Sequence, residues 1–148
     1  YLSVMDTLMQ DLQEMFSKAL MAEGGFRARL DAVATTVFEY LSDNADAAQI
    51  LVREMVDGGP FVEAHGQDAI ASTLTVGAQF FELGMAAGEF RQQDPRQLMI
   101  SLVGLGLYSF AAVEVTTAFL NTSPLAGEGR DDRNAALKSH LMTLCCND

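Results

Sequence analysis

The sequence contains little of what most specialised protein classes need. Its 148 residues include no Trp, three Pro and two Cys, and 9 Lys and Arg stand against 20 Asp and Glu. Two Cys are too few for a disulfide-rich secreted fold. The net charge of −11, with the few bases scattered along the chain, opposes binding to phosphate backbones and to anionic membranes. We therefore expect that the chain alone binds neither nucleic acid nor a membrane.

Long apolar runs and targeting signals are also lacking. The longest run without charge, residues 97–113, spans 17 residues and includes Gln, Ser and Gly. A membrane-spanning helix needs roughly 20 predominantly apolar residues. The start of the chain has no basic region and reaches an acid at Asp6, so no signal peptide is predicted. These absences and the scarcity of Cys favour a cytoplasmic location.

Apolar residues recur every three or four positions along most of the chain, which is the period of an amphipathic helix. The alternation typical of strands is missing, so we predict an all-α fold. With 49% apolar residues, one domain over 1–148 can bury a sizeable core. Six main helices are predicted, over residues 2–20, 26–42, 48–56, 67–87, 95–119 and 131–145. A turn is expected at 61–66 and a mobile loop at 121–130.

Capping signals set several of these boundaries. Gly58, followed by Gly59 and Pro60, should end the third helix, and Gly88 should cap the fourth. Asp94 has the character of an N-cap, because Pro95 follows at the first helical position. The fifth predicted helix therefore restarts sharply.

The fifth helix is apolar all the way round between residues 98 and 113, so one face should meet the core and another a partner subunit. Small residues at spacings of three and four offer a face for close approach. We predict a two-fold dimer in which this helix and the last one form a four-helix bundle. The candidate interface residues are Ser101, Gly104, Leu105, Tyr108, Ala112, Leu137, Leu141 and Leu144.

Eight Met and nine Phe, many of them on the first four helices, are the most informative excess. Flexible thioethers and large rings can line an adaptable apolar cavity, although the same residues also make an ordinary packed core. Candidate cavity walls are Phe16, Phe38, Met55, Phe61, Phe80, Phe81 and Leu105, with His65 as a possible polar contact. The expected ligand is a flat or flexible hydrophobic molecule, since these walls offer little charge.

Motifs for catalysis or metal binding are not found. His65 and His140 follow Val62 and Leu137 at the spacing where di-iron bundles carry Glu. Adjacent Cys145 and Cys146 point about 100° apart on a helix and cannot both face one ion. No base flanks the Cys pair in sequence, so we interpret it as a frayed helix end rather than a redox sensor. Neither a nucleophile elbow nor a phosphate-binding loop is present. We expect no enzyme, no metal and no cofactor.

Several segments together carry a family resemblance. Three segments carry it: the opening Tyr1-Leu2-Ser3-Val4-Met5, the link from Ala87 to Pro95, and the apolar helix over 98–113. In these segments and in the order of its helix lengths, the chain resembles the ligand-binding and dimerisation domain of TetR-family transcriptional regulators. No basic helix-turn-helix precedes Tyr1, so the chain is expected to be a fragment of a longer regulator that binds DNA only through that missing part.

The resemblance implies an effector-sensing homodimer, in which a hydrophobic small molecule inside each subunit tilts the first helix and alters DNA binding. Two other classes remain open from the residues alone. One is a structural or interaction dimer with a solid core. The other is a small helical enzyme or a carrier of lipids or other ligands that uses the same cavity.

Overall fold

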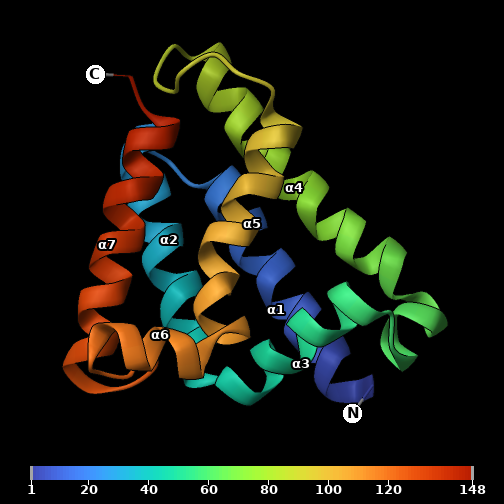
Figure 1. Ribbon diagram of the computed structural model, residues 1–148. Coiled ribbons are helices and arrows are strands. Elements are labelled where there is room, and N and C mark those ends of the chain that lie inside the picture. The colour runs from blue at the N-terminus through green and yellow to red at the C-terminus, as the bar shows by residue number, and fades with distance from the viewer. Residues whose placement is uncertain (1, 148) are drawn as a thin grey trace.

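The computed structural model describes residues 2–147, and of residues 65 and 66 it describes the backbone alone. The protein is all-helical, as its periodicity predicts (Figure 1). No strand forms within residues 2–147, where a single bridge joins Phe90 to Cys146. The helices of this part of the chain are α1 (Leu2–Met21), α2 (Phe26–Asp43), α3 (Ala45–Asp57), the π-helical turn η1 (Val62–Gly66), α4 (Gln67–Ala86), α5 (Pro95–Ala111), α6 (Val113–Leu120) and α7 (Gly127–Cys145).

The first four predicted helices are confirmed as α1 to α4, and their capping signals explain why. Gly58 ends α3 with φ 67° and Gly88 follows α4 with φ 78°, a left-handed conformation that glycine adopts without strain. Asp94 is the N-cap of α5, and its carboxylate accepts hydrogen bonds from the N–H groups of Arg96 (2.9 Å) and Gln97 (3.3 Å).

The single helix predicted over 95–119 is wrong. α5 ends at Ala111 and α6 begins at Val113, and the two are bent by 80°. Ala112 between them adopts φ −124° and ψ 45°, outside the helical region, while its N–H donates to the carbonyl of Tyr108 at 2.9 Å. Neither Gly nor Pro marks this break. β-Branched residues, which weaken helix propensity, crowd the next turn.

The mobile loop predicted over 121–130 is also wrong, because α7 begins at Gly127, four residues before the expected start. The connection before it is short and packed around the buried Pro124. Gly129 lies so close to the carbonyl of Ser123 that a Cβ there would overlap it. This compact turn brings α7 back alongside α2.

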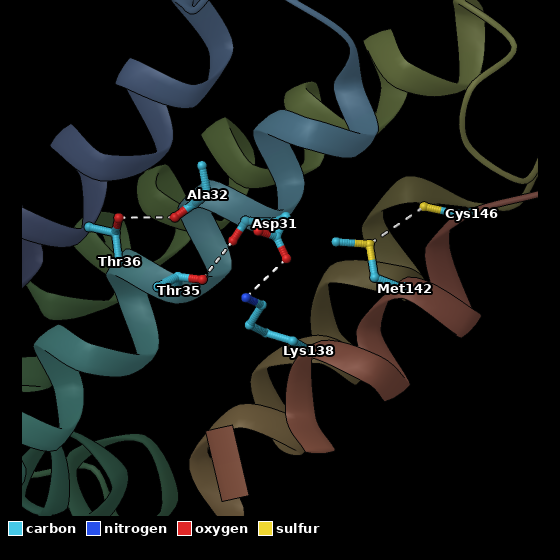
Figure 2. Close-up of polar contacts among 7 residues, drawn as sticks. All are labelled: Asp31, Ala32, Thr35, Thr36, Lys138, Met142 and Cys146. Atoms are coloured by element: carbon cyan, nitrogen blue, oxygen red, sulfur yellow. Dashed lines mark hydrogen bonds and ion pairs between the residues drawn. The ribbon is translucent and has the colours of Figure 1, made fainter. Parts of the chain in front are cut away.

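Charged residues fasten α7 to α2 at two levels. The Lys138 ammonium lies 3.0 Å from a carboxylate oxygen of Asp31, as Figure 2 shows, and Arg130 pairs with Asp43 at 2.8 Å. All four side chains keep some contact with water, so each pair contributes modestly. The two ion pairs mainly set the alignment of α7 against α2.

Two buried apolar clusters form the interior. One lies between α2, α4, α5 and α7 and includes Phe80, Phe81 and Phe90, whose ring centroids are 5.4 to 5.7 Å apart. The other gathers the first half of α1 with α3, Phe61 and Phe110. Half-buried residues of α1 and α2 pack against both clusters. In Figure 1, α1 runs through the centre of the molecule. Its residues contribute to both clusters.

The last turn of α7 is held by the link between α4 and α5. The N–H of Arg91 donates to the carbonyl of Cys145 at 2.8 Å, and the amide of Gln93 donates to the carbonyl of Leu144 at 2.8 Å. The amide of Asn147 donates to the carbonyl of Gly88 at 3.1 Å. We call these contacts the C-terminal clasp. The helix end is therefore fixed, and the predicted fraying is wrong.

Candidate ligand-binding cavity

A cavity of about 130 Å³ lies where the two apolar clusters meet. Its walls come from α1, α2, α3, α4 and α5, and Leu141 of α7 completes them. The sequence forms this hollow because large rings and thioethers from five helices converge there and do not fill the space between them. The cavity is partly open to the surface, since Met55 lies on its wall and is itself exposed.

The structure brings six of the eight candidate site residues to this cavity. These six are Phe16, Phe38, Met55, Phe80, Phe81 and Leu105. Phe61 is not on the wall, because it is fully buried in the cluster of α1 and α3. The side chain of His65 lies outside the described part of the chain.

Packing and void coexist at the aromatic end of the cavity. The rings of Phe80 and Phe81 have centroids 5.4 Å apart and are almost completely buried, yet both line the hollow. Gly84 makes room for this arrangement, because a Cβ at its position would overlap the ring of Phe90. The two rings therefore bound the cavity without filling it.

One face of α2 contributes wall residues that the list of candidates left out. They are Leu30, Val33, Ala34, Val37 and Leu41, which lie at helical spacing beside the predicted Phe38. Four of these five belong to the apolar stripe by which the sequence predicts α2, so the periodicity carried the signal. The periodicity could not predict the distance between this face of α2 and α5.

Thr73 is the only polar residue on the cavity wall within the described residues, and its hydroxyl already has a partner. The Thr73 Oγ1 donates to the carbonyl of Ala69 at 3.0 Å, within its own helix. No Lys, Arg, Asp or Glu belongs to the wall. The cavity thus offers dispersion contacts and no free charge.

Sequence reasoning missed a buried acid close to the cavity. Glu54, with 2% of its surface exposed, lies on α3 next to Met55, but its carboxylate points to the start of η1. There it accepts hydrogen bonds from the N–H groups of Phe61 (3.4 Å) and Val62 (3.2 Å). A charge at a helix N-terminus is stabilised by the backbone donors and the helix dipole. Glu54 therefore fixes the junction between α3 and α4.

The candidate interface residues fall into two groups. Ser101, Gly104 and Tyr108 on α5 and Leu144 on α7 are exposed. Leu137 and Leu141 are buried inside the subunit, Leu105 is on the cavity wall, and Ala112 is half-buried at the bend. We therefore drop Leu137 and Leu141 from the interface, because the α2–α7 contact already covers that side of α7.

Exposed apolar residues on α6 were not among the candidates. Phe119 has 84% of its surface exposed, and Val115 and Leu120 are exposed as well. Ile100 on α5 adds to them. No residue of α6 is buried, and a sequence read as one straight helix gave no sign of that. An apolar surface of this kind marks a site of protein contact.

The two Cys residues are buried thiols. Burial raises the pKa of Cys145 to about 12. Burial also raises the pKa of Cys146, although Arg27 and Arg91 oppose the shift. These two bases are distant in sequence, so the absence of a base beside the pair along the chain gave no sign of them, but both thiols are protonated at neutral pH. Within residues 2–147, apart from the undescribed side chains, no group of three potential metal ligands forms.

Within the described residues, no single helix is long and apolar enough to span a membrane. The pair α5 and α6 would pass by length and composition together, but it is bent by 80°.

Comparison with known proteins identifies the fold and the family. Curated protein sequences gave no significant match. Among solved structures, a transcriptional regulator of the TetR/AcrR family from Thermobifida fusca YX-ER1 is similar, with a TM-score of 0.71 and 15% identity over 95% of this chain and 70% of that chain. At that identity the likeness establishes the fold alone. A family model described as "Tetracyclin repressor-like, C-terminal domain" matches residues 26–139, more than half of the sequence. The chain therefore belongs to the tetracyclin repressor-like family, as a C-terminal domain.

Proposed function

We propose that this chain is the effector-sensing and homodimerisation domain of a TetR-like transcriptional regulator. A hydrophobic small molecule binds in the cavity of each subunit and alters DNA binding by an N-terminal helix-turn-helix domain. The observation that carries the proposal is the apolar cavity of about 130 Å³ in a domain of this family. The family match points to a transcription regulator rather than an enzyme.

The position of α1 supports a direct route from the cavity to a DNA-binding domain. Met9, Leu12 and Phe16 of α1 line the cavity. In regulators of this type, the helix in this position leads toward the DNA-binding domain. A ligand that fits one tilt of α1 better than another shifts the balance between the two. A difference of about 1–3 kcal/mol in binding is enough to change DNA affinity 5- to 150-fold.

The exposed apolar face supports a dimer. Tyr108 on α5, Leu144 on α7 and Phe119 on α6 present side chains that a single subunit leaves in water. Two copies related by a two-fold axis would bury α5 and α7 in a four-helix bundle. The net charge of −11 fits a domain that leaves DNA contact to another part of the protein. Such a regulator works in the cytoplasm.

The size and position of the cavity weigh against the alternatives. A purely structural dimer needs no hollow between its two clusters, and closing one would stabilise it. A lipid carrier needs space for a long acyl chain. The volume of this cavity, about 130 Å³, is close to that of an engineered void of roughly 150 Å³ that holds benzene.

Sedimentation and binding measurements on the chain test the proposal. The mass in solution should be twice the 16.0 kDa of the monomer at micromolar concentration. A panel of hydrophobic small molecules should contain binders that raise Tm. Met55→Phe, which narrows the cavity from its exposed rim, should weaken these binders at least several-fold while the mass stays dimeric. A monomer, or a complete lack of binders, would contradict the proposal.

A further inference from the structure

We infer that the ligand is a small, uncharged aromatic hydrocarbon without a polar head group, in the size range of benzene to ethylbenzene. This inference rests on the proposed function and narrows it. It excludes organic acids, amines and long acyl chains, which a merely hydrophobic cavity would not exclude. Four features of the wall support it.

The first feature is that no described polar atom of the wall needs a partner. The Thr73 hydroxyl donates to Ala69, and helical hydrogen bonds occupy the backbone groups of the wall helices. In the described part of the chain, the one buried side-chain polar atom without a partner is Nε of Arg29. That guanidinium lies over the ring of Phe26 and donates to the end of α1, away from the cavity. A polar head group would therefore find nothing to bond.

The second feature is the commitment of the nearest buried charge. Glu54 is adjacent in sequence to the wall residue Met55, and an amine could pair with it only by displacing the N–H groups of Phe61 and Val62. Both N–H groups would then lose the acceptor that Glu54 gives them, which disfavours the exchange. A carboxylic acid would find no cation to pair with, because no Lys or Arg belongs to the wall. Both ionic classes are disfavoured.

The third feature is the chemistry of the wall. Phe16, Phe38, Phe80 and Phe81 supply four rings, and Met9, Met55 and Met99 supply three thioethers. Ring edges and sulfur atoms make favourable contacts with an aromatic guest beyond simple burial. An aliphatic molecule of the same volume would lack these contacts.

The fourth feature is size. The cavity of about 130 Å³ is slightly smaller than the void of roughly 150 Å³ that takes benzene in an engineered protein. The exposed, flexible Met55 at the rim allows limited growth toward an ethyl substituent. A fused polycycle or a long chain would have to push helices apart.

A panel of guests that share one ring tests the inference on the intact chain. Toluene, phenol, benzoate and benzylamine are titrated while the methyl resonances of the methionines and Tm are followed. Toluene should bind saturably, raise Tm and shift the Met9, Met55 and Met99 signals. Benzoate and benzylamine should bind at least a hundredfold more weakly, because burying an unmatched ionic group costs several kcal/mol.

Two matched variants locate the site. Ala34→Leu fills the cavity from α2, and Ala28→Leu adds the same side chain on the exposed face of that helix. The first should abolish toluene binding, and the second should leave it intact. If Ala34→Leu does not fold, Met55→Phe should reduce toluene affinity in its place.

The outcomes separate the inference from the proposed function. Binding of benzoate or benzylamine as tight as that of toluene would overturn the ligand class but keep a sensing cavity. Binding of dodecane or naphthalene by a protein that does not bind toluene would likewise overturn the ligand class but keep a sensing cavity. If no guest binds, including xenon under pressure, both the inference and the sensing role fail.

Discussion

Two glycines on neighbouring helices differ in whether the structure has room for a Cβ in place of a glycine hydrogen. Gly84 on α4 lies against the ring of Phe90, whereas a Cβ at Gly106 on α5 would meet only Phe38, at an ordinary 3.5 Å. The same substitution therefore has opposite consequences at the two positions.

We predict that Gly106→Ala raises the free energy of unfolding by about 0.5–1 kcal/mol, because alanine is the better helix former. Gly84→Ala should lower it by about 1–3 kcal/mol, because the new methyl group displaces an aromatic ring in the core. Urea denaturation of the two variants and the wild type measures both. Equal effects of the two substitutions would show that the Phe90 contact does not limit the packing.

Cys145 makes stability depend on alkaline pH. Burial raises its pKa from the ordinary 9.0 to about 12 in the folded protein. A raised pKa means that the contribution is complete below pH 9 and is lost as the pH rises toward 12, because the unfolded thiol ionises first. The free energy of unfolding should therefore fall between pH 8 and 10.

Cys145→Ala is the matched test of this slope. The variant should be less stable at pH 7, because it leaves a small void, but its stability should decline less between pH 8 and 10. Denaturant titrations at several pH values provide the data. Identical slopes in the two proteins would assign the alkaline loss to other groups, such as Tyr40, whose pKa burial and Asp11 also raise.

At the scale of elements, the N-cap of α5 stabilises a helix that serves both the cavity and the exposed face. We predict that Asp94→Ala lowers the free energy of unfolding by about 1 kcal/mol, since two backbone donors lose their acceptor. Asp94→Ser should recover most of the loss. Thermal unfolding of the three proteins checks this, and failure of Ser to rescue would point to charge rather than capping.

The elements that the sequence predicted well are those with local signals. Capping residues and apolar periodicity defined α1 to α4, because both depend on neighbours within one or two turns. The bend at Ala112 has no such signal, since neither Gly nor Pro stands at the break and α6 has no buried residue. The packed turn before Gly127 was missed for the same reason: its composition is that of a loop, but tertiary contacts order it.

The residues of the candidate cavity also differ in how far local signals could predict them. Six wall residues could be named because large apolar side chains on helical stripes usually face inward. Phe61 obeys that rule too, yet it packs inside the cluster of α1 and α3 and not on the wall, and only the arrangement of helices decides between these positions. Glu54 could not be found, because its partners are backbone groups at the start of η1.

At the scale of the whole molecule, the apolar face over α5, α6 and α7 predicts the oligomeric state. Tyr108→Glu places a charge among the exposed residues of α5 and should convert the dimer into a monomer of 16.0 kDa. Leu83→Glu, on an exposed part of α4, is the control and should remain dimeric. Sedimentation equilibrium distinguishes the two. A dimeric Tyr108→Glu protein would move the interface elsewhere.

The hollow between the two clusters also makes the molecule soft toward compression. Hydrostatic pressure favours whichever state occupies less volume, and unfolding eliminates the internal void. The empty protein should therefore unfold at a lower pressure than the protein with toluene in its cavity. Because the chain has three Tyr and no Trp, tyrosine fluorescence can follow this transition.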